Sequence, residues 1–114
     1  MGATTDNIHA VICPSIAQES YETGPEFYEQ FVNDNTNSQR YFKPALKPKH
    51  ALFDLKAYVK DRLQNLNLKA IALIDLDTYT NEDRFFSYRR TYHKGEKNYG
   101  GNLSFICLKK PRPL

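Results

Sequence analysis

At 114 residues the chain is long enough for one domain with a core of its own and too short for two. Hydrophobic residues make up 40% and charged residues 25%, as in ordinary globular proteins, and no stretch approaches the roughly 20 apolar residues of a membrane span. Eight basic residues and one acidic residue lie between Arg84 and Leu114, a balance of +7, while the rest of the chain carries −4.

The amino terminus has neither the basic start nor the long apolar run of a signal peptide. Cys13 and Cys107 both lie in apparent strands, outside any CxxC pattern or zinc-like spacing with histidine. We therefore expect a cytoplasmic protein with no membrane partner, whose two cysteines are reduced, buried thiols.

The first elements are a strand and a helix. Ile8–Ile12 is a short apolar run that ends before Pro14, which predicts a strand. Thr23 is placed to cap a helix that continues to about Val32, and Glu26 three residues later completes a capping box. The residues that follow are all polar and predict a loop.

The middle of the chain predicts two strands around a second helix. Two prolines prevent Tyr41–His50 from pairing as a central strand. Ala51–Phe53 predicts a brief strand, and Asp54 is placed to cap a helix over Leu55–Asn65. Ala70–Ile74 is the most hydrophobic run of the chain, so we expect a buried strand there.

The last third predicts a short helix, a loop and a terminal strand. We expect the helix over Glu82–Arg90, a loop with three glycines over Lys94–Asn102, and a central strand over Leu103–Leu108. Residues 110–114 predict a flexible tail. The order of the elements favours an α+β fold, in which helices pack on one face of a mixed sheet.

Paired arginines beside paired aromatics are the main candidate for binding. Arg89 and Arg90 follow Phe85 and Phe86, and guanidinium forks suit an anion such as phosphate. The alternative is that the aromatics are core and the arginines pair with carboxylates or cap helix ends. His93 lies within reach of a phosphate bound there, or is a solvated loop histidine.

The remaining polar candidates are weaker. Asp75 and Asp77 follow a predicted strand, on the same side by period two, and suit a divalent cation or proton transfer. The alternative is that they cap the loop. His9, His50 and His93 are widely separated and form no HxH or HExxH pattern, so we assign no metal ligand and no catalytic residue.

Several motifs, in order, resemble those of one family. They are AVICPSIAQESYETG at 10–24, FDL at 53–55, the pair Asp77-Thr78, FFSYRR at 85–90 and NYGGNLSFICL at 98–108. This set is similar to the carboxy-terminal half of the laccase-domain family, whose members were first called multicopper polyphenol oxidases and are now described as purine nucleoside phosphorylases. FFSYRR is the most specific single piece.

The chain also departs from the family pattern. Family members are about twice this length, within the size range of one larger domain. Their metal site is assigned to two histidines and a cysteine of the amino-terminal half, one histidine within a HAGWRG-like segment, and no such segment occurs here. Cys13 replaces a family glycine, and Gly101 stands where the family carries the arginine of DYGR. The resemblance therefore implies that residues 1–109 are a single partial domain, half of a larger α/β sandwich.

The resemblance implies phosphorolysis of purine nucleosides (adenosine, inosine, methylthioadenosine) together with adenosine deamination. It implies zinc, or copper, held by residues outside this chain, and a substrate site to which Tyr88, Arg89, Arg90 and His93 contribute. We expect the chain to be inactive alone, with an apolar face exposed.

Two alternatives remain. The main expectation is an inactive remnant that forms a self-dimer. In the first alternative the chain is instead a half-enzyme, which a separate amino-terminal half-protein completes. In the other, the basic carboxy-terminal region makes the chain a nucleic-acid-binding module. We do not expect nucleic acid as the partner, because no recognised binding motif is present.

Overall fold

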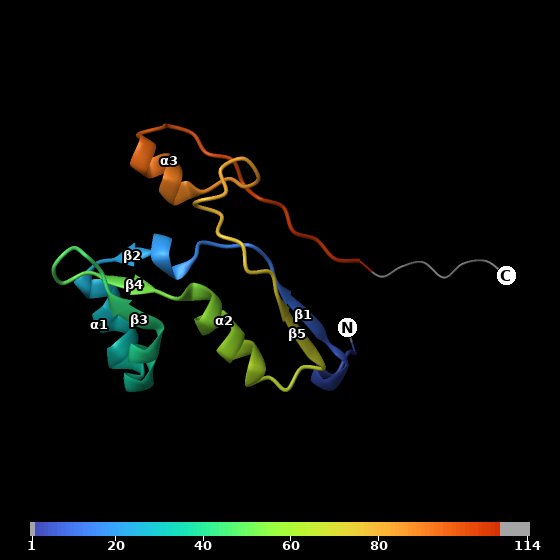
Figure 1. Ribbon diagram of the computed structural model, residues 1–114. Coiled ribbons are helices and arrows are strands. Elements are labelled where there is room, and N and C mark those ends of the chain that lie inside the picture. The colour runs from blue at the N-terminus through green and yellow to red at the C-terminus, as the bar shows by residue number, and fades with distance from the viewer. Residues whose placement is uncertain (1, 108–114) are drawn as a thin grey trace.

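The computed structural model of the protein describes residues 2–107. The elements are η1 (Thr5–Asn7), β1 (His9–Ile12), η2 (Gln18–Ser20), β2 (Glu22–Thr23), α1 (Pro25–Asp34), η3 (Thr36–Tyr41), β3 (Phe42–Pro44), β4 (Ala51–Phe53), α2 (Leu55–Gln64), β5 (Ala70–Leu73) and α3 (Tyr88–Lys94). The strands form a parallel pair, β1–β5, and an antiparallel sheet ordered β2–β4–β3 (Figure 1). The predicted α+β class is confirmed, with the parallel and antiparallel pairs in separate sheets.

α1 and the three-stranded sheet lie together at one end of the molecule (Figure 1), and an aromatic cluster forms the core between them. Phe53 on β4 is only 1% exposed. Five aromatic rings have their centroids 4.9–5.9 Å from that of Phe53, at distances that suit edge-to-face and offset packing: Tyr21, Phe27, Phe31, Phe42 and Tyr58. The many aromatic residues of the chain therefore serve, in part, to build this core.

The start of α1 differs from the prediction. Gly24 rather than Thr23 is the N-cap, without a side-chain hydrogen bond, and Pro25 stands in the first turn. Thr23 lies in β2, where its buried hydroxyl donates a hydrogen bond to the carbonyl oxygen of Ala51 at 2.9 Å. Because that hydroxyl is already used within the sheet, the predicted capping box with Glu26 does not form.

The predicted second helix is confirmed as α2. The carboxylate of Asp54 accepts a hydrogen bond from the amide of Ala57 at 3.0 Å, as an N-cap should. β3 is an edge strand and carries Pro44. Proline is tolerated there because an edge strand can spare its N–H. This agrees with the expectation that Tyr41–His50 forms no central strand.

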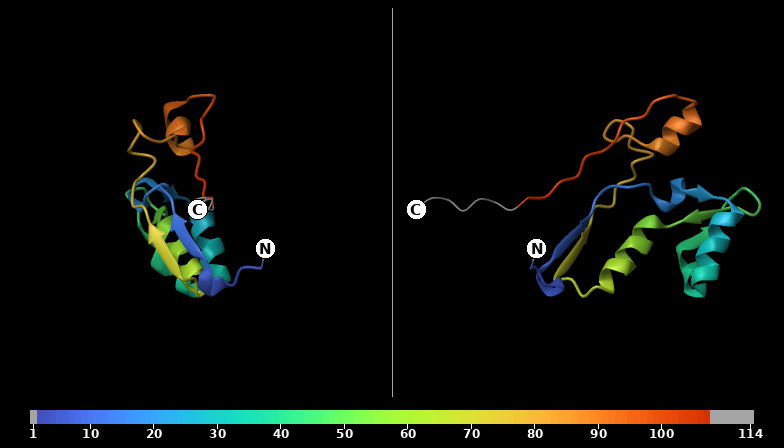
Figure 2. Two further views of the ribbon diagram at one scale, coloured as in Figure 1. Left: turned by 90° about the vertical axis from the view of Figure 1, so that its right-hand side faces the viewer. Right: turned by 180° about the vertical axis from the view of Figure 1, so that it is seen from behind.

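The parallel pair β1–β5 is covered on one face only. Its register places His9 opposite Ala70 and Ile12 opposite Leu73, and α2 packs against both strands. In the views of Figure 2 no other helix covers the pair. The strand predicted over Ala70–Ile74 is confirmed as β5, but Ala70, Ala72 and Leu73 are exposed, so its predicted burial was wrong. Two strands with a single covering helix leave one side of the sheet to solvent.

The predicted helix over Glu82–Arg90 lies further along the chain. Ser87 caps α3 by accepting a hydrogen bond from the amide of Arg90, so the helix starts at Tyr88. It ends at Gly95, whose φ of +70° is the left-handed conformation that glycine adopts without strain.

The predicted terminal strand is wrong for residues 103–107. This segment is extended and exposed, with no strand beside it in the described part of the chain. Cys107 is therefore exposed instead of buried, and Cys13 is only partly covered. Leu108 and the predicted tail at 110–114 lie outside the described residues. Within residues 2–107, every helix is too short or too polar to cross a membrane.

Candidate functional site

The carboxyl ends of β1 and β5 lie at the same edge of their sheet because the two strands are parallel. Beyond them the chain stays paired through a parallel bridge between Ser15 and Asp77. Asp77 holds this junction together. Its carboxylate accepts hydrogen bonds from the amides of Ala17 and Tyr79 at 3.1 and 2.9 Å and from the hydroxyl of Ser20 at 2.5 Å. The loop-capping interpretation of Asp77 is therefore confirmed.

This environment keeps the Asp77 carboxylate charged. Burial is the largest single influence and acts to raise its pKa, but the hydrogen bonds from Ser20, Ala17 and Tyr79 together outweigh burial. The pKa of Asp77 is therefore lowered from its ordinary value. Close by, the hydroxyl of Ser15 is buried without a hydrogen-bond partner among the described residues. A buried hydroxyl without a partner is unusual in a folded protein, so this group could accept a hydrogen bond from a bound molecule or donate one to it.

Asp75 does not join Asp77. The buried ammonium group of Lys56, on α2, donates to the Asp75 carboxylate at 3.2 Å and to the carbonyl of Leu76 at 2.9 Å. Each aspartate thus has its own partners. Asp75 and Asp77 therefore do not form the paired site that was predicted to hold a divalent cation or move a proton.

Arg90 joins α3 to the turn that follows β5. One terminal nitrogen of its guanidinium donates to the carbonyls of Thr78 and Tyr79, both at 2.8 Å, and the other donates to the carbonyl of Phe85. These bonds use three of the five N–H donors of the group. Among residues 2–107 the other two donors have no acceptor, so they and the positive charge are left for a further one. The alternative expectation was that the arginines pair with carboxylates, but the nearby Glu82 pairs with Lys94 instead.

The other three predicted site residues also lie on α3. Arg89 donates to the carbonyl of Glu22 at 2.7 Å and lies over the ring of Tyr21. His93 hydrogen-bonds through Nδ1 to the hydroxyl of Tyr79 at 2.7 Å. Tyr88 is 63% exposed. All four residues thus lie on one helix, but Arg89 reaches β2, whereas Arg90 and His93 both bond to Tyr79 in the turn after β5.

A hollow of about 390 Å³ lies beside α3. Its lining combines aromatic, cationic and anionic side chains and includes Phe86, Arg90, Glu96, Tyr99 and Gly100. Tyr99 packs edge-on against Tyr88 with the ring centroids 4.9 Å apart. Flat rings beside a guanidinium suit a planar ligand that carries an anionic group.

The described residues do not fit a zinc or copper centre by themselves. No three histidine, cysteine, aspartate or glutamate side chains converge anywhere in residues 2–107. Structural metal sites need three or four such donors within about 2.0–2.3 Å of the ion. Any metal would have to take ligands from outside the described part of the chain.

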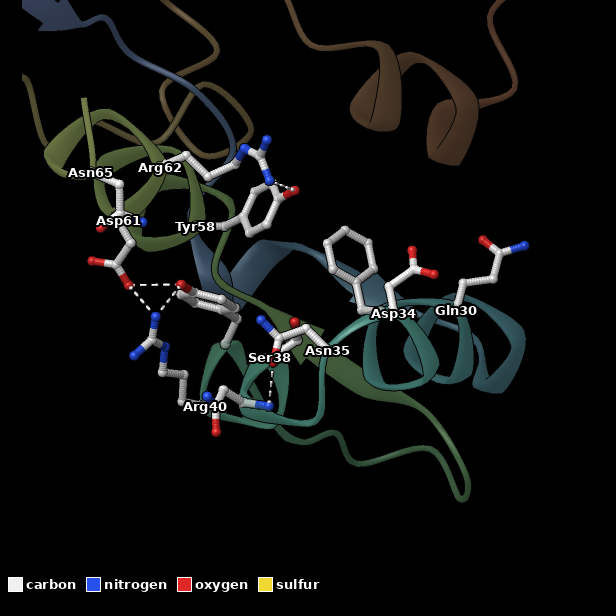
Figure 3. A pocket seen from close by; sticks show the side chains of 12 residues that line it. Gln30, Asp34, Asn35, Ser38, Arg40, Tyr58, Asp61, Arg62 and Asn65 are labelled. Atoms are coloured by element: carbon white, nitrogen blue, oxygen red, sulfur yellow. Dashed lines mark hydrogen bonds and ion pairs between the residues drawn. The ribbon is translucent and has the colours of Figure 1, made fainter.

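A second hollow, of about 350 Å³, lies between α1, η3 and α2 (Figure 3). Arg40 and Asp61 form an ion pair at 3.2 Å, and the hydroxyl of Tyr41 donates to Asp61 at 2.7 Å. Burial, followed by this hydrogen bond, raises the pKa of Tyr41. Arg62 donates to the hydroxyl of Tyr58 nearby, as Figure 3 shows. The polar groups of this hollow largely satisfy one another.

Several residues of the junction were missed from sequence. Ser20 bonds to Asp77, and Tyr79 bonds to His93. The partners are far apart in the sequence, and no local sequence pattern indicates such pairs. Asn102 was also missed. Its side-chain amide accepts from the Phe86 N–H and donates to the Phe86 carbonyl, at 2.9 and 2.8 Å. Asparagine after two glycines predicts a turn, which was the available signal.

Comparison with known proteins gives consistent matches. Residues 1–109 match the family model described as multi-copper polyphenol oxidoreductase laccase. Two proteins named purine nucleoside phosphorylase, from Rickettsia conorii and Rickettsia prowazekii, are 41% and 42% identical to this chain over 103 residues, covering 90% of it and 43% of each relative. One of the same name from Escherichia coli is 34% identical over 104 residues, 90% of this chain and 40% of the relative.

One solved structure matches as well. The crystal structure of a Neisseria meningitidis protein of the family DUF152 has a TM-score of 0.60 and 25% identity, and the match covers 68% of this chain and 31% of that one. The chain therefore spans less than half the length of the curated relatives it matches.

Proposed function

Because this chain belongs to the multi-copper polyphenol oxidoreductase laccase family, we propose that it carries one wall of a site for the phosphorolysis of purine nucleosides. The observation that carries the proposal is the match along nearly the whole chain to relatives named purine nucleoside phosphorylase. The substrates would be adenosine, inosine and methylthioadenosine, and the same site would deaminate adenosine.

Phosphorolysis needs a cation beside developing negative charge. An oxygen of inorganic phosphate forms a bond to C1′ of the ribose, the bond from C1′ to the purine breaks, and the purine leaves with the electron pair and takes up a proton. Arg90, two of whose N–H donors have no acceptor in the described part of the chain, and Arg89 would hold the phosphate. Tyr88 and Tyr99 offer exposed rings against which a purine can stack.

His93 would orient rather than react. Its ring is tied to the Tyr79 hydroxyl, which leaves Nε2 for a ribose hydroxyl or a phosphate oxygen. No step is assigned to a metal, because the described donors do not fit one.

We propose that the chain alone is inactive. The hollow beside α3 is open, and most of the hydrogen bonds of Arg90 go to main-chain carbonyls. One wall of a pocket does not hold a substrate in the geometry that catalysis needs. The second candidate, a half-enzyme completed by a separate amino-terminal half-protein, is favoured by the uncovered face of β1–β5.

Purine release decides between these proposals. The purified chain is incubated with adenosine or inosine and inorganic phosphate, and free base and deaminated nucleoside are measured by chromatography. We expect no product above background from the chain alone, and base release once the unmatched amino-terminal part of the Rickettsia conorii relative is added. Omission of phosphate is the matched control and should abolish base release but not deamination.

Two results would contradict the proposal. Base release by the chain alone would overturn its inactivity. A mixture that forms a complex but releases no base, while the whole relative does so under the same conditions, would overturn the assignment of a substrate-binding wall.

A further inference from the structure

The segment Leu103–Cys107 has the character of a strand but no sheet to join. Leu103, Phe105 and Ile106 are 85%, 83% and 84% exposed. No hydrogen bond joins its backbone to any other described residue. Aromatic and β-branched side chains favour strands, and an extended apolar segment with unpaired N–H and C=O groups is a template for pairing with another strand.

The direction of this segment is fixed where it starts. The amide side chain of Asn102 clamps the backbone of Phe86 through two hydrogen bonds, and the ring of Phe86 lies against Gly100. From there the segment leaves α3 and runs clear of β1 and β5 (Figures 1 and 2). The hydrogen bonds of Asn102 therefore direct the segment away from the β1–β5 sheet of the same molecule.

An acceptor for a strand is present in the same molecule. β1 and β5 pair only with each other among the described residues, so both outer edges of the sheet are free. Apolar side chains on or beside these strands are also exposed, with Val11 at 49%, Ile74 at 41% and Ile8 at 37%. A two-stranded sheet is marginally stable alone, and a third strand would stabilise it.

We propose that two copies of the chain form a dimer by exchanging this segment. Leu103–Cys107 of each copy pairs as a strand along a free edge of the β1–β5 sheet of the other copy. Each copy contributes one donor segment and one acceptor edge, so the exchange closes with two-fold symmetry and leaves no donor unpaired.

Charge favours a second copy as the occupant. The region from Arg84 onward carries +7 and the preceding 83 residues carry −4. Of this charge, +4 lies in the described residues 84–107. Exchange would bring this part of one copy toward the acidic body of the other, which is the complementarity expected between bound partners. The proposal concerns assembly only, so it stands or falls separately from nucleoside phosphorolysis.

The mass of the chain in solution tests the exchange. Light scattering after size exclusion should give about twice 13.2 kDa for the wild type. Phe105→Asp places a charge in the exchanged strand and should raise the dimer dissociation constant at least about tenfold. Leu46→Asp is the matched control, because Leu46 is 105% exposed in the turn between β3 and β4 and should leave the dimer unchanged.

Hydrogen exchange locates the contact. Amides of residues 103–107 should be protected in the wild type and unprotected in Phe105→Asp, whose circular dichroism should otherwise match the wild type. A monomeric wild type, large polydisperse aggregates instead of a dimer, or a Phe105→Asp variant that dimerises as well as Leu46→Asp would each overturn the proposal. Protection of the segment in a monomer would show pairing within one copy and would overturn it too.

Discussion

Phe53 is the largest side chain that is fully buried in residues 2–107, and five aromatic rings surround it. The other buried apolar residues there are Ile12 and Tyr41. Because so few apolar side chains are fully buried, each has a large share in the stability of the fold.

Truncation of this ring should therefore be severe. We expect Phe53→Ala to lower the free energy of unfolding by about 3–5 kcal/mol, since it removes apolar contacts and leaves a cavity. Urea denaturation followed by circular dichroism measures the change. Leu46→Ala, at a fully exposed position, should stay within about 0.5 kcal/mol of the wild type. Equal effects of the two changes would contradict the position of the core.

Asp77 stabilises the junction only while its carboxylate is charged. Its pKa is lowered in the folded protein from the ordinary 3.8. The resulting stability is thus fully present above that ordinary value and is lost as the pH falls through the lowered, folded-state pKa.

Asp77→Asn should reveal this pH dependence. At pH 7 we expect a loss of about 1–3 kcal/mol in the free energy of unfolding, because asparagine cannot accept all three hydrogen bonds as a charged group does. The difference from the wild type should shrink below pH 3.8, where the carboxylate of the unfolded wild type takes up a proton, until the pH has fallen through the lowered pKa of the folded protein. Denaturation series at several pH values measure the difference, and a constant difference down to low pH would show that Asp77 acts through packing alone.

At the scale of elements, α3 is held mainly by hydrogen bonds to main-chain groups. Arg89 and Arg90 bind carbonyls of β2 and of the turn after β5, and Asn102 binds the backbone of Phe86. These bonds set the hollow beside α3 in place. The loop that lines this hollow also requires Gly100, because a Cβ there would lie 2.7 Å from the Phe86 ring.

The adjacent glycines should respond differently to alanine. Gly100→Ala should cost about 1–3 kcal/mol, because the Phe86 ring has to move. Gly101→Ala should be nearly neutral, since a Cβ at Gly101 meets nothing within 4 Å. Thermal unfolding of the two variants measures the contrast. If Gly101→Ala is the more harmful, the packing of this loop is wrong.

Local signals predicted the elements that local chemistry determines. The cap at Asp54 placed α2, and Pro14 marked the end of β1. Thr23 was misjudged because its hydroxyl bonds to Ala51, 28 residues away, and no local pattern contains that partner. Ser87 was a cap signal that lay inside the predicted helix, and the run FFSYRR concealed it.

The candidate site was predicted only in part. The motif FFSYRR correctly placed Tyr88, Arg89 and Arg90 at one helix, but their partners are backbone carbonyls, which no sequence pattern identifies. Tyr79, Ser20 and Asn102 reach the site through folding across long separations. Whether Tyr88, Arg89, Arg90 and His93 bind substrate stays a prediction.

At the scale of the whole molecule, two apolar surfaces stay uncovered by any other part of residues 2–107. The aromatic core lies at one end, whereas β1–β5 and the segment at 103–107 leave apolar side chains exposed. Exposed patches of this kind mark sites of association. Exposed apolar surface is expected if the chain forms only one wall of a pocket, because the other wall would cover part of it.

Nuclear magnetic resonance of the labelled chain, titrated with inosine in the presence of inorganic phosphate, tests most directly whether this wall binds substrate. We expect amide resonances of α3, of Tyr79 and of the loop at Gly100 to shift with ligand, even though no product forms, while those near Arg40 and Asp61 stay unchanged. Resonances of α3 that do not move, or shifts confined to the hollow at Arg40 and Asp61, would contradict the proposed site.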